Sequence, residues 1–134
     1  MTGDRRDRAD ERALVAQWRE ILALHARTAC EIERELHPLG IGASDFEVLD
    51  VLADGDGEDG AAFRVQELAD RVHLSQSALS RLVARLEKDG LVDRGVCSED
   101  RRGVWVALTE AGRLRYEQAR PGHRAVLERM LAQH

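Results

Sequence analysis

The side chains best suited to chemistry in this sequence are polar ones grouped within ten positions. They are a glutamine, two serines and two arginines, namely Gln76, Ser77, Ser80, Arg81 and Arg85. In the major groove of DNA, arginine pairs with guanine, glutamine pairs with adenine, and serine pairs with either base. If one face of a single element presents these residues, they predict a surface that reads base pairs.

A helix is the element that the surrounding residues predict. Apolar residues recur with the i, i+3, i+4, i+7 spacing of a helix that buries one face, at Leu79, Leu82, Val83 and Leu86. Ser75 is a favourable N-cap before the first apolar turn, and Gly90 is the usual residue after a helix end. The polar side chains are therefore expected on the solvent-exposed face.

The flanking segments complete a recognisable plan. Residues 65–72 predict a short helix, and His73-Leu74 a tight turn into the polar helix, which together make a helix-turn-helix. Residues 91–97 and 104–108 are rich in β-formers, with a polar tip at 98–103, and residues 62–64 are expected to add a third strand. A helix-turn-helix followed by a hairpin with a basic tip describes a winged helix.

At this point the residues match a known family. The stretch at 79–92 reads Leu-Ser-Arg-Leu-Val-Ala-Arg-Leu-Glu-Lys-Asp-Gly-Leu-Val, and Asp-Arg-Arg-Gly at 100–103 and Leu-Thr-Glu-Ala-Gly at 108–112 follow it. This sequence closely resembles the multiple-antibiotic-resistance regulator (MarR) family from about residue 14 to 127. The resemblance implies a mainly α fold with a small antiparallel β-wing (α+β) and long flanking dimerisation helices. It also implies a homodimer that binds pseudo-palindromic operator DNA, here expected to be a repressor without a cofactor.

The same resemblance assigns roles in DNA binding. The residues expected to line the major groove are Ser75, Gln76, Ser77, Ser80 and Arg81, with Arg81 as the main base reader. Arg102 is expected to enter the minor groove, whose narrow walls favour a guanidinium, while Asp100 orients it and Arg101 lies alongside. Phosphate contacts are expected from Arg85 and Arg94. The alternative for these two is a solvated arginine or an ion pair with Glu87, Asp89 or Asp93.

The chain is expected to form a single domain, residues 1–134, and its two ends are expected to mediate dimerisation. Dimerisation helices are expected at 10–37 and 109–132, around a DNA-binding lobe at 44–108. The first would be roughly 40 Å long at 1.5 Å per residue, whereas a compact domain of this size has a radius of gyration near 14 Å. It therefore overhangs its own domain with an apolar face made of Leu14, Trp18, Ile21, Leu22, His25, Ala29, Ile32 and Leu36. The simplest cover for that face is a second copy of the chain.

The sequence also predicts the start of one helix and an interruption in another. A capping box with Ser44 as the cap and Glu47 at the third position is expected to open a helix through Leu52. Pro121-Gly122 is expected to kink or split the last helix.

Regulation is implied by the resemblance, through a small phenolic or aromatic ligand or an oxidant. Trp18, His25 and Phe46 are candidates to line a ligand pocket, with ordinary core packing as the alternative. Cys97 is the better redox candidate, because Arg101 and Arg102 are near it in sequence. Cys30 has three glutamates near it in sequence, and negative charges disfavour the reactive thiolate. An inert buried thiol is the alternative.

Composition sets the remaining bounds. The net charge is −5, but the acidic excess lies in residues 1–63, so the cations near the reading helix must share one face to attract phosphate. No apolar run of about 18 residues predicts a membrane span, and the charged N-terminus without a signal sequence predicts a cytoplasmic protein. No catalytic or metal motif is present, and the acidic loop at 54–60 fails the calcium-loop pattern. A winged helix that contacts proteins without reading DNA is the alternative function.

Overall fold

The computed structural model describes residues 2–55, 62–96 and 104–132. Its elements in chain order are α1 (Thr2–Leu36), η1 (His37–Leu39), α2 (Ala43–Asp54), β1 (Ala62–Arg64), α3 (Val65–Val72), α4 (Gln76–Lys88), β2 (Val92–Val96), β3 (Val104–Leu108) and α5 (Glu110–Leu131). The chain is mainly helical with one small antiparallel sheet, which confirms the predicted fold class. Cys97, Asp100, Arg101 and Arg102, and most of the acidic loop, lie outside the described residues.

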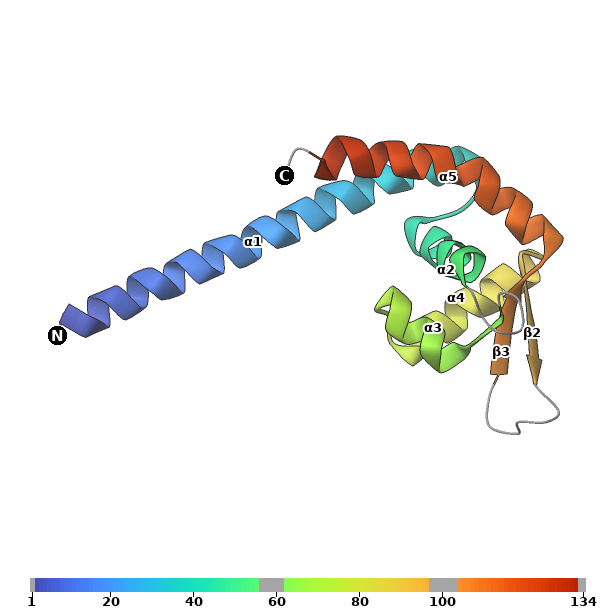
Figure 1. Cartoon of the computed structure of the whole chain (residues 1–134), viewed down its shortest axis with the longest axis horizontal. Helices are drawn as coiled ribbons and strands as arrows, with labels where there is room; N and C mark the ends of the chain where they lie inside the picture. The colour runs from blue at the N-terminus through green and yellow to red at the C-terminus, as the bar shows by residue number, and fades with distance from the viewer. Residues whose placement is uncertain (1, 56–61, 97–103, 133–134) are drawn as a thin grey trace.

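The long first helix stands apart from the rest of the molecule. In Figure 1, α1 extends far beyond the other elements, and α5 runs beside its C-terminal part. α2, α3, α4 and the sheet form a lobe on one side of this pair. Residues 3–23 of α1 are all exposed, so this stretch buries nothing against its own chain.

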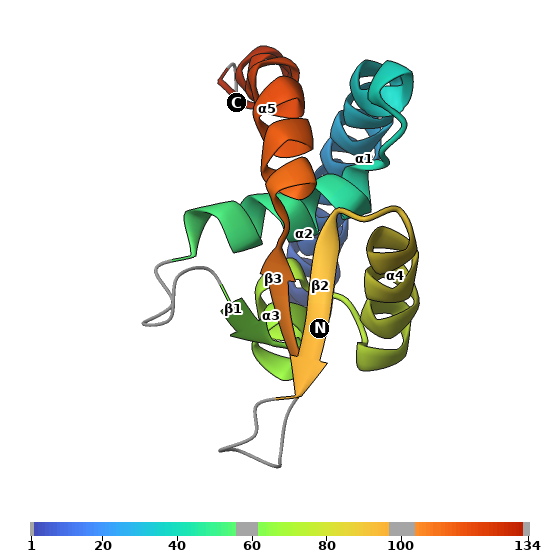
Figure 2. The ribbon, with the colours of Figure 1, turned by 90° about the vertical axis from the view of Figure 1, so that its right-hand side faces the viewer.

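The lobe contains the predicted helix-turn-helix and its wing. His73 takes the left-handed conformation between α3 and α4, with φ of 57°, and its N–H bonds to the carbonyl of Ala69. The sheet order is β1-β3-β2, with both pairings antiparallel, and Figure 2 shows α4 beside the sheet. The strand predicted at 62–64 is confirmed. β2 begins at Val92, one residue later than the predicted 91–97, and the predicted last residue, Cys97, lies outside the described residues.

The core lies around α2, which the surrounding elements cover. Phe46, Val48, Leu49 and Leu52 are fully buried in α2. They belong to one apolar cluster with buried side chains of the other elements, including Leu68, Leu79, Val83, Leu86, Val106 and Val126. Burial of this kind is the main favourable term in folding. α2 is therefore the scaffold against which α4 packs.

The predicted capping box of α2 is wrong by two residues. The helix begins at Ala43, with Gly42 as its extended N-cap, and Ser44 lies exposed inside the first turn. Asp45 occupies the third helical position, and its carboxylate accepts a 2.9 Å hydrogen bond from the N–H of Gly42. Because that carboxylate accepts from an N–H at the helix start, Asp45 has the capping role that the sequence assigned to Glu47.

The start of α1 also differs from expectation. α1 begins at Thr2 rather than near Asp10, and an i,i+4 ion pair between Asp4 and Arg8 (3.6 Å) supports its first turns. At 1.5 Å per residue it is roughly 52 Å long.

α5 is not split at Pro121, although it bends along its length (Figure 1), because buried residues on both sides of the proline keep it packed. No helix in the described part of the chain is both long and apolar enough to cross a lipid bilayer.

Candidate nucleic-acid interface

The reading helix α4 has the two faces that its sequence predicts. Leu79, Leu82, Val83 and Leu86 are buried, whereas all the polar candidates on the opposite side are exposed: Gln76, Ser77, Ser80, Arg81 and Arg85. Ser75 is the N-cap, and its hydroxyl oxygen accepts a 3.2 Å hydrogen bond from the N–H of Ala78. It also lies 3.3 Å from the hydroxyl of Ser77. Ser75 therefore shapes the start of the reading surface.

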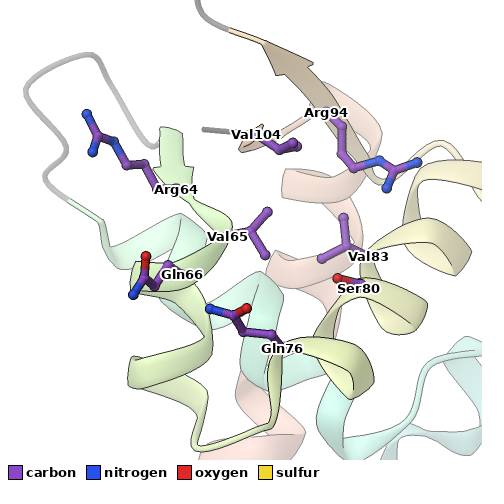
Figure 3. A pocket seen from close by; sticks show the side chains of 8 residues that line it. All are labelled: Arg64, Val65, Gln66, Gln76, Ser80, Val83, Arg94 and Val104. Carbon is purple, nitrogen blue, oxygen red and sulfur yellow. The ribbon is translucent and has the colours of Figure 1, made fainter. Parts of the chain in front are cut away.

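A cleft of about 270 Å³ separates the start of α3 from α4 and the sheet. Val65, Val83 and Val104 contribute its apolar wall, and the polar side chains around them are Arg64, Gln66, Gln76, Ser80 and Arg94 (Figure 3). Arg64 and Gln66 were not among the sequence candidates, because residues 64–66 were assigned only as the junction of a strand and a helix. Their signal was a basic side chain directly before the first helix of the helix-turn-helix and an amide side chain in the first turn of that helix.

Arg64 also packs against the sheet. Its guanidinium carbon lies 5.3 Å from the centre of the half-buried Trp105 ring, within the range of a cation–π contact. Trp105 is thus a packing residue of the wing strand.

Arg94 is ion-paired within the protein. Its Nη2 and Nε donate hydrogen bonds of 3.0 and 3.2 Å to Oε1 of Glu87. These hydrogen bonds hold the pKa of the Glu87 carboxyl below its usual range. The ion-pair alternative left open by the sequence is therefore present for Arg94. The pair joins the last turn of α4 to β2.

Arg85 also has a partner, one that its sequence neighbours do not suggest. Its Nη2 donates a hydrogen bond to Oδ1 of Asp45, which lies in α2, 40 residues earlier. The Asp45 side chain is 10% exposed and the Arg85 side chain 59% exposed, so the pair runs from the core to the reading surface.

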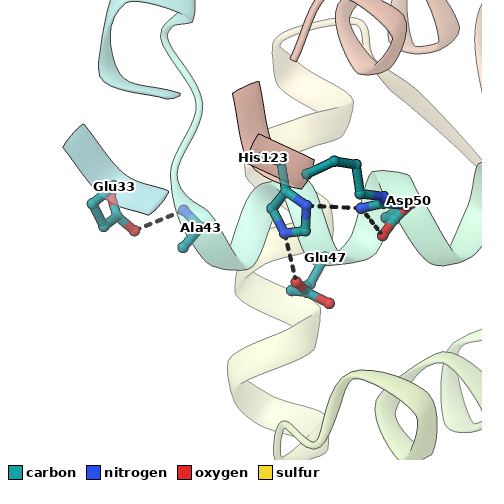
Figure 4. A network of polar contacts seen from close by, with 6 residues as sticks. Glu33, Ala43, Glu47, Asp50 and His123 are labelled. Carbon is teal, nitrogen blue, oxygen red and sulfur yellow. Dashed lines mark hydrogen bonds and ion pairs between the residues drawn. The ribbon is translucent and has the colours of Figure 1, made fainter. Parts of the chain in front are cut away.

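A second polar group ties α5 to α2. Arg124 donates hydrogen bonds of 2.8 and 3.1 Å to the two carboxylate oxygens of Asp50, and a 2.7 Å hydrogen bond to Nδ1 of His123. Because a guanidinium only donates, Nδ1 of His123 accepts, and its Nε2 faces Glu47 Oε1 at 3.5 Å (Figure 4). Hydrogen bonding to Asp50 raises the pKa of Arg124. The side of the lobe away from α4 is thus fixed to α5.

The predicted effector residues do not share one environment. Phe46 is fully buried, with its ring 4.2 Å from that of His123 and 5.6 Å from that of Tyr116. It is a core residue, the alternative that the sequence left open, and it does not line an open pocket. Trp18 is 57% exposed and His25 is exposed, both on α1.

Redox and metal candidates add little to the described part of the chain. Cys30 is a free, exposed thiol on α1. Among the described residues, no group of three or more histidine, cysteine, aspartate or glutamate side chains is placed to hold a metal ion.

These features define a winged helix-turn-helix protein with long flanking helices. The chain belongs to the MarR family, whose model matches residues 39–103. It is similar to the crystal structure of AbsC, a MarR family transcriptional regulator from Streptomyces coelicolor, with a TM-score of 0.79 and 31% identity over 88% of this chain and 78% of that one. It is also similar to Sco3205 from the same organism, solved in complex with DNA, with a TM-score of 0.79 and 28% identity over 89% of this chain and 73% of that one.

A curated relative gives the same family at lower coverage. The HTH-type transcriptional repressor MdtR of Bacillus subtilis (strain 168) is 31% identical over 71 residues, which are 53% of this chain and 46% of MdtR. The chain spans about half the length of the curated relatives it matches first. These relatives are transcriptional regulators and not enzymes.

Proposed function

We propose that this protein is a transcriptional regulator that reads a pseudo-palindromic operator in double-stranded DNA as a homodimer. The observation that carries the proposal is the two-sided character of α4. Its apolar face is buried on the scaffold of α2, and its outward face presents a glutamine, serines and arginines. A protein-contact module has no need for that set of side chains, whereas base edges in the major groove match it.

Within this proposal the outward residues have separate tasks. Gln76, Ser77, Ser80 and Arg81 contact base edges, and Arg81 makes the strongest contact because a guanidinium bonds guanine through two hydrogen bonds. Ser75 sets the start of the helix and approaches the DNA with it. Arg94 would contact phosphate through Nη1, because its Nε and Nη2 bond Glu87. The minor-groove roles of Asp100, Arg101 and Arg102 stay predictions, since these residues lie outside the described part.

The exposed face of α1 supports the dimer. Leu14, Trp18, Ile21 and Leu22 are 66%, 57%, 54% and 45% exposed, which leaves a continuous apolar stripe in water. We propose residues 10–37 and 109–132 as dimerisation helices around a DNA-binding lobe at 44–108. Two copies would place two reading helices one helical turn apart, roughly 10 base pairs.

Repression and ligand control complete the proposal. MdtR is named a repressor, and a dimer seated on an operator would block access to the DNA it covers. A small aromatic molecule or an oxidant would modulate this binding. Trp18 and His25 on α1, and Cys97, are the remaining candidates, because Phe46 is enclosed in the core.

The first test is selection of the bound sequence from a pool of random duplexes. We expect recovered sites to contain two inverted half-sites about 10 base pairs apart. On the recovered duplex, Arg81→Ala should lose about 10- to 100-fold in affinity, the range for one base contact. Arg5→Ala, an exposed arginine of α1 before the proposed dimerisation segment, is the matched control and should bind like the wild type.

Two outcomes would contradict the proposal. One is a recovered pool without a shared motif. The other is equal binding of the wild type and Arg81→Ala to selected and random DNA. In either case the protein-contact function would become the better explanation of the fold.

A further inference from the structure

Asp45 is a nearly buried carboxylate at the start of the scaffold helix. Such a group must find partners for both oxygens, because it loses its hydration on folding. Oδ2 accepts a 2.9 Å hydrogen bond from the N–H of Gly42, and Oδ1 accepts one from the Arg85 guanidinium. Oδ2 thus caps the start of α2, and Oδ1 holds α4 through Arg85.

The Arg85 side chain leaves the exposed face of α4 and reaches back to α2. Its charge is therefore committed to a carboxylate that is 10% exposed, although the side chain itself is 59% exposed. Because 40 residues separate the two partners, the pair fixes α4 against α2 independently of the helix-turn-helix turn. An ionised pair of this kind also has a defined geometry, since both groups are charged and hydrogen-bonded.

The same end of α2 is tied to α1. Oε1 of Glu33 accepts a 2.7 Å hydrogen bond from the N–H of Ala43 (Figure 4). A Cβ placed on Gly42 would lie 3.3 Å from Glu33 Oε1 and 3.5 Å from Asp45 Oδ2, so the two carboxylates converge on one helix start. Carboxylates are favourable there because the N-terminus of a helix carries partial positive charge. Polar contacts therefore run without a break from α1 through α2 to α4.

We propose that Asp45 is a positioning residue for DNA binding, and that Arg85 acts through it inside the protein rather than on phosphate. The proposal rests on the proposed function, because it concerns how the reading helix is held for an operator. A dimer reads two half-sites at once, so the direction of each α4 relative to the dimerisation helices must be fixed. The Glu33, Asp45 and Arg85 contacts fix it.

The two roles for Arg85 predict opposite effects. As a phosphate ligand, Arg85 would contribute about one unit to the salt dependence of binding, and freeing it from Asp45 would strengthen binding. As a partner of Asp45, it contributes nothing to the salt slope, and freeing it weakens specific binding.

The experiment is a double-mutant cycle of Asp45→Asn, Arg85→Met and the two together. Asparagine keeps an oxygen for the N–H of Gly42, and methionine keeps the length of the exposed arginine stem. Affinities for the selected operator and for random DNA are measured over a salt series. We expect each single variant to lose about tenfold on the operator, equivalent to about 1.4 kcal/mol. The double variant should lose no more than either, and the slope and random-DNA affinity should not change.

The controls separate positioning from general damage. Asp4→Asn is the same kind of change at an exposed ion pair with Arg8 (3.6 Å), before the proposed dimerisation segment, and should bind like the wild type. Urea unfolding of every variant establishes that the assayed protein is folded, and an unfolded variant would lose random-DNA binding as well.

Three results would overturn the inference while leaving the proposed function intact. They are an Asp45→Asn variant that binds the operator as tightly as the wild type or more tightly, losses that add in the double variant, and a salt slope reduced by about one in Arg85→Met. A wild-type chain without sequence preference would instead overturn the proposed function, and this inference with it.

Discussion

Glu87 in the last turn of α4 accepts three hydrogen bonds from a single residue of the wing, Arg94. The backbone N–H of Arg94 bonds Oε2 at 3.2 Å, and its Nε and Nη2 bond Oε1 at 3.2 and 3.0 Å. Between them the chain turns at Gly90, whose φ of 78° favours glycine. One carboxylate therefore fixes β2 of the wing to the last turn of α4.

This pair predicts an acid-sensitive contact. The pKa of Glu87 is lowered by the side-chain hydrogen bonds from Arg94. Because the folded pKa lies below the unfolded value of about 4.3, the stabilisation is complete above that value and is lost as the pH falls through the folded pKa. NMR titration of the carboxyl carbon in Arg94→Ala should show the Glu87 pKa raised towards its ordinary range, since the side-chain hydrogen bonds are lost and the backbone one stays. Arg5→Ala, an exposed arginine at the start of α1, should leave it unchanged, and an unchanged pKa in Arg94→Ala would contradict the contact.

Tyr116 provides a second titration, at alkaline pH. Burial, followed by the Asp50 carboxylate, raises its pKa above the usual value of about 10. The unfolded chain then loses this proton first, so stability falls as the pH rises from the unfolded pKa towards the folded one. The chain contains one tyrosine, so its ultraviolet absorbance reports this group alone. Asp50→Asn should lower the midpoint, and no shift between the variant and the wild type would contradict the assignment.

Gly112 is predicted to be irreplaceable for the fold. A Cβ at this position would lie 2.0 Å from the backbone oxygen of Leu91, which cannot rotate away. Gly112→Ala should therefore lower the free energy of unfolding by about 3 kcal/mol, the upper part of the range for overpacking. Gly95→Ala meets nothing within 4 Å and should stay within about 0.5 kcal/mol of the wild type. Urea denaturation at one protein concentration measures both, and equal stabilities would show that the close approach is absent.

The exposed stripe of α1 predicts a measurable dimer interface. Trp18→Glu places a charge in the stripe, and a buried tryptophan at an interface is worth about 2 kcal/mol or more. We expect the dimer dissociation constant to rise by at least about 30-fold in sedimentation equilibrium. Gln17→Glu adds the same charge one residue earlier and is the control. Equal association of the two variants would place the interface elsewhere.

Local signals were sufficient for the elements that form the reading surface. The spacing of Leu79, Leu82, Val83 and Leu86 identified the buried face of α4, and Ser75 marked its start. Alternation in residues 104–108 located β3 at its observed bounds. Each of these features depends on neighbours within one turn or one strand, and such neighbours are visible in the sequence.

The pairings that orient these elements were not predictable in the same way. Asp45 and Arg85 are 40 residues apart, and Asp50 and Arg124 are 74 apart, so the partner of each charge depends on the packed fold. The misplaced capping box has the same origin. Ser44 satisfied the local pattern, but the turn through Gly42 put Asp45 at the third position instead. The sequence therefore predicted which residues lie on the exposed face of α4 better than it predicted the contacts that hold α4 in place.

The exposed stretch of α1 should make the helical content of the protein depend on its concentration. A free helix of about 20 residues is only marginally stable in water, because its stability in proteins comes mainly from packing. Residues 3–23 have no such packing within one chain. By mass action, their helical content should therefore fall on dilution together with the dimer. The concentration of the protein in a cell would then determine what fraction of the chains has a fully helical α1 and forms the proposed dimer.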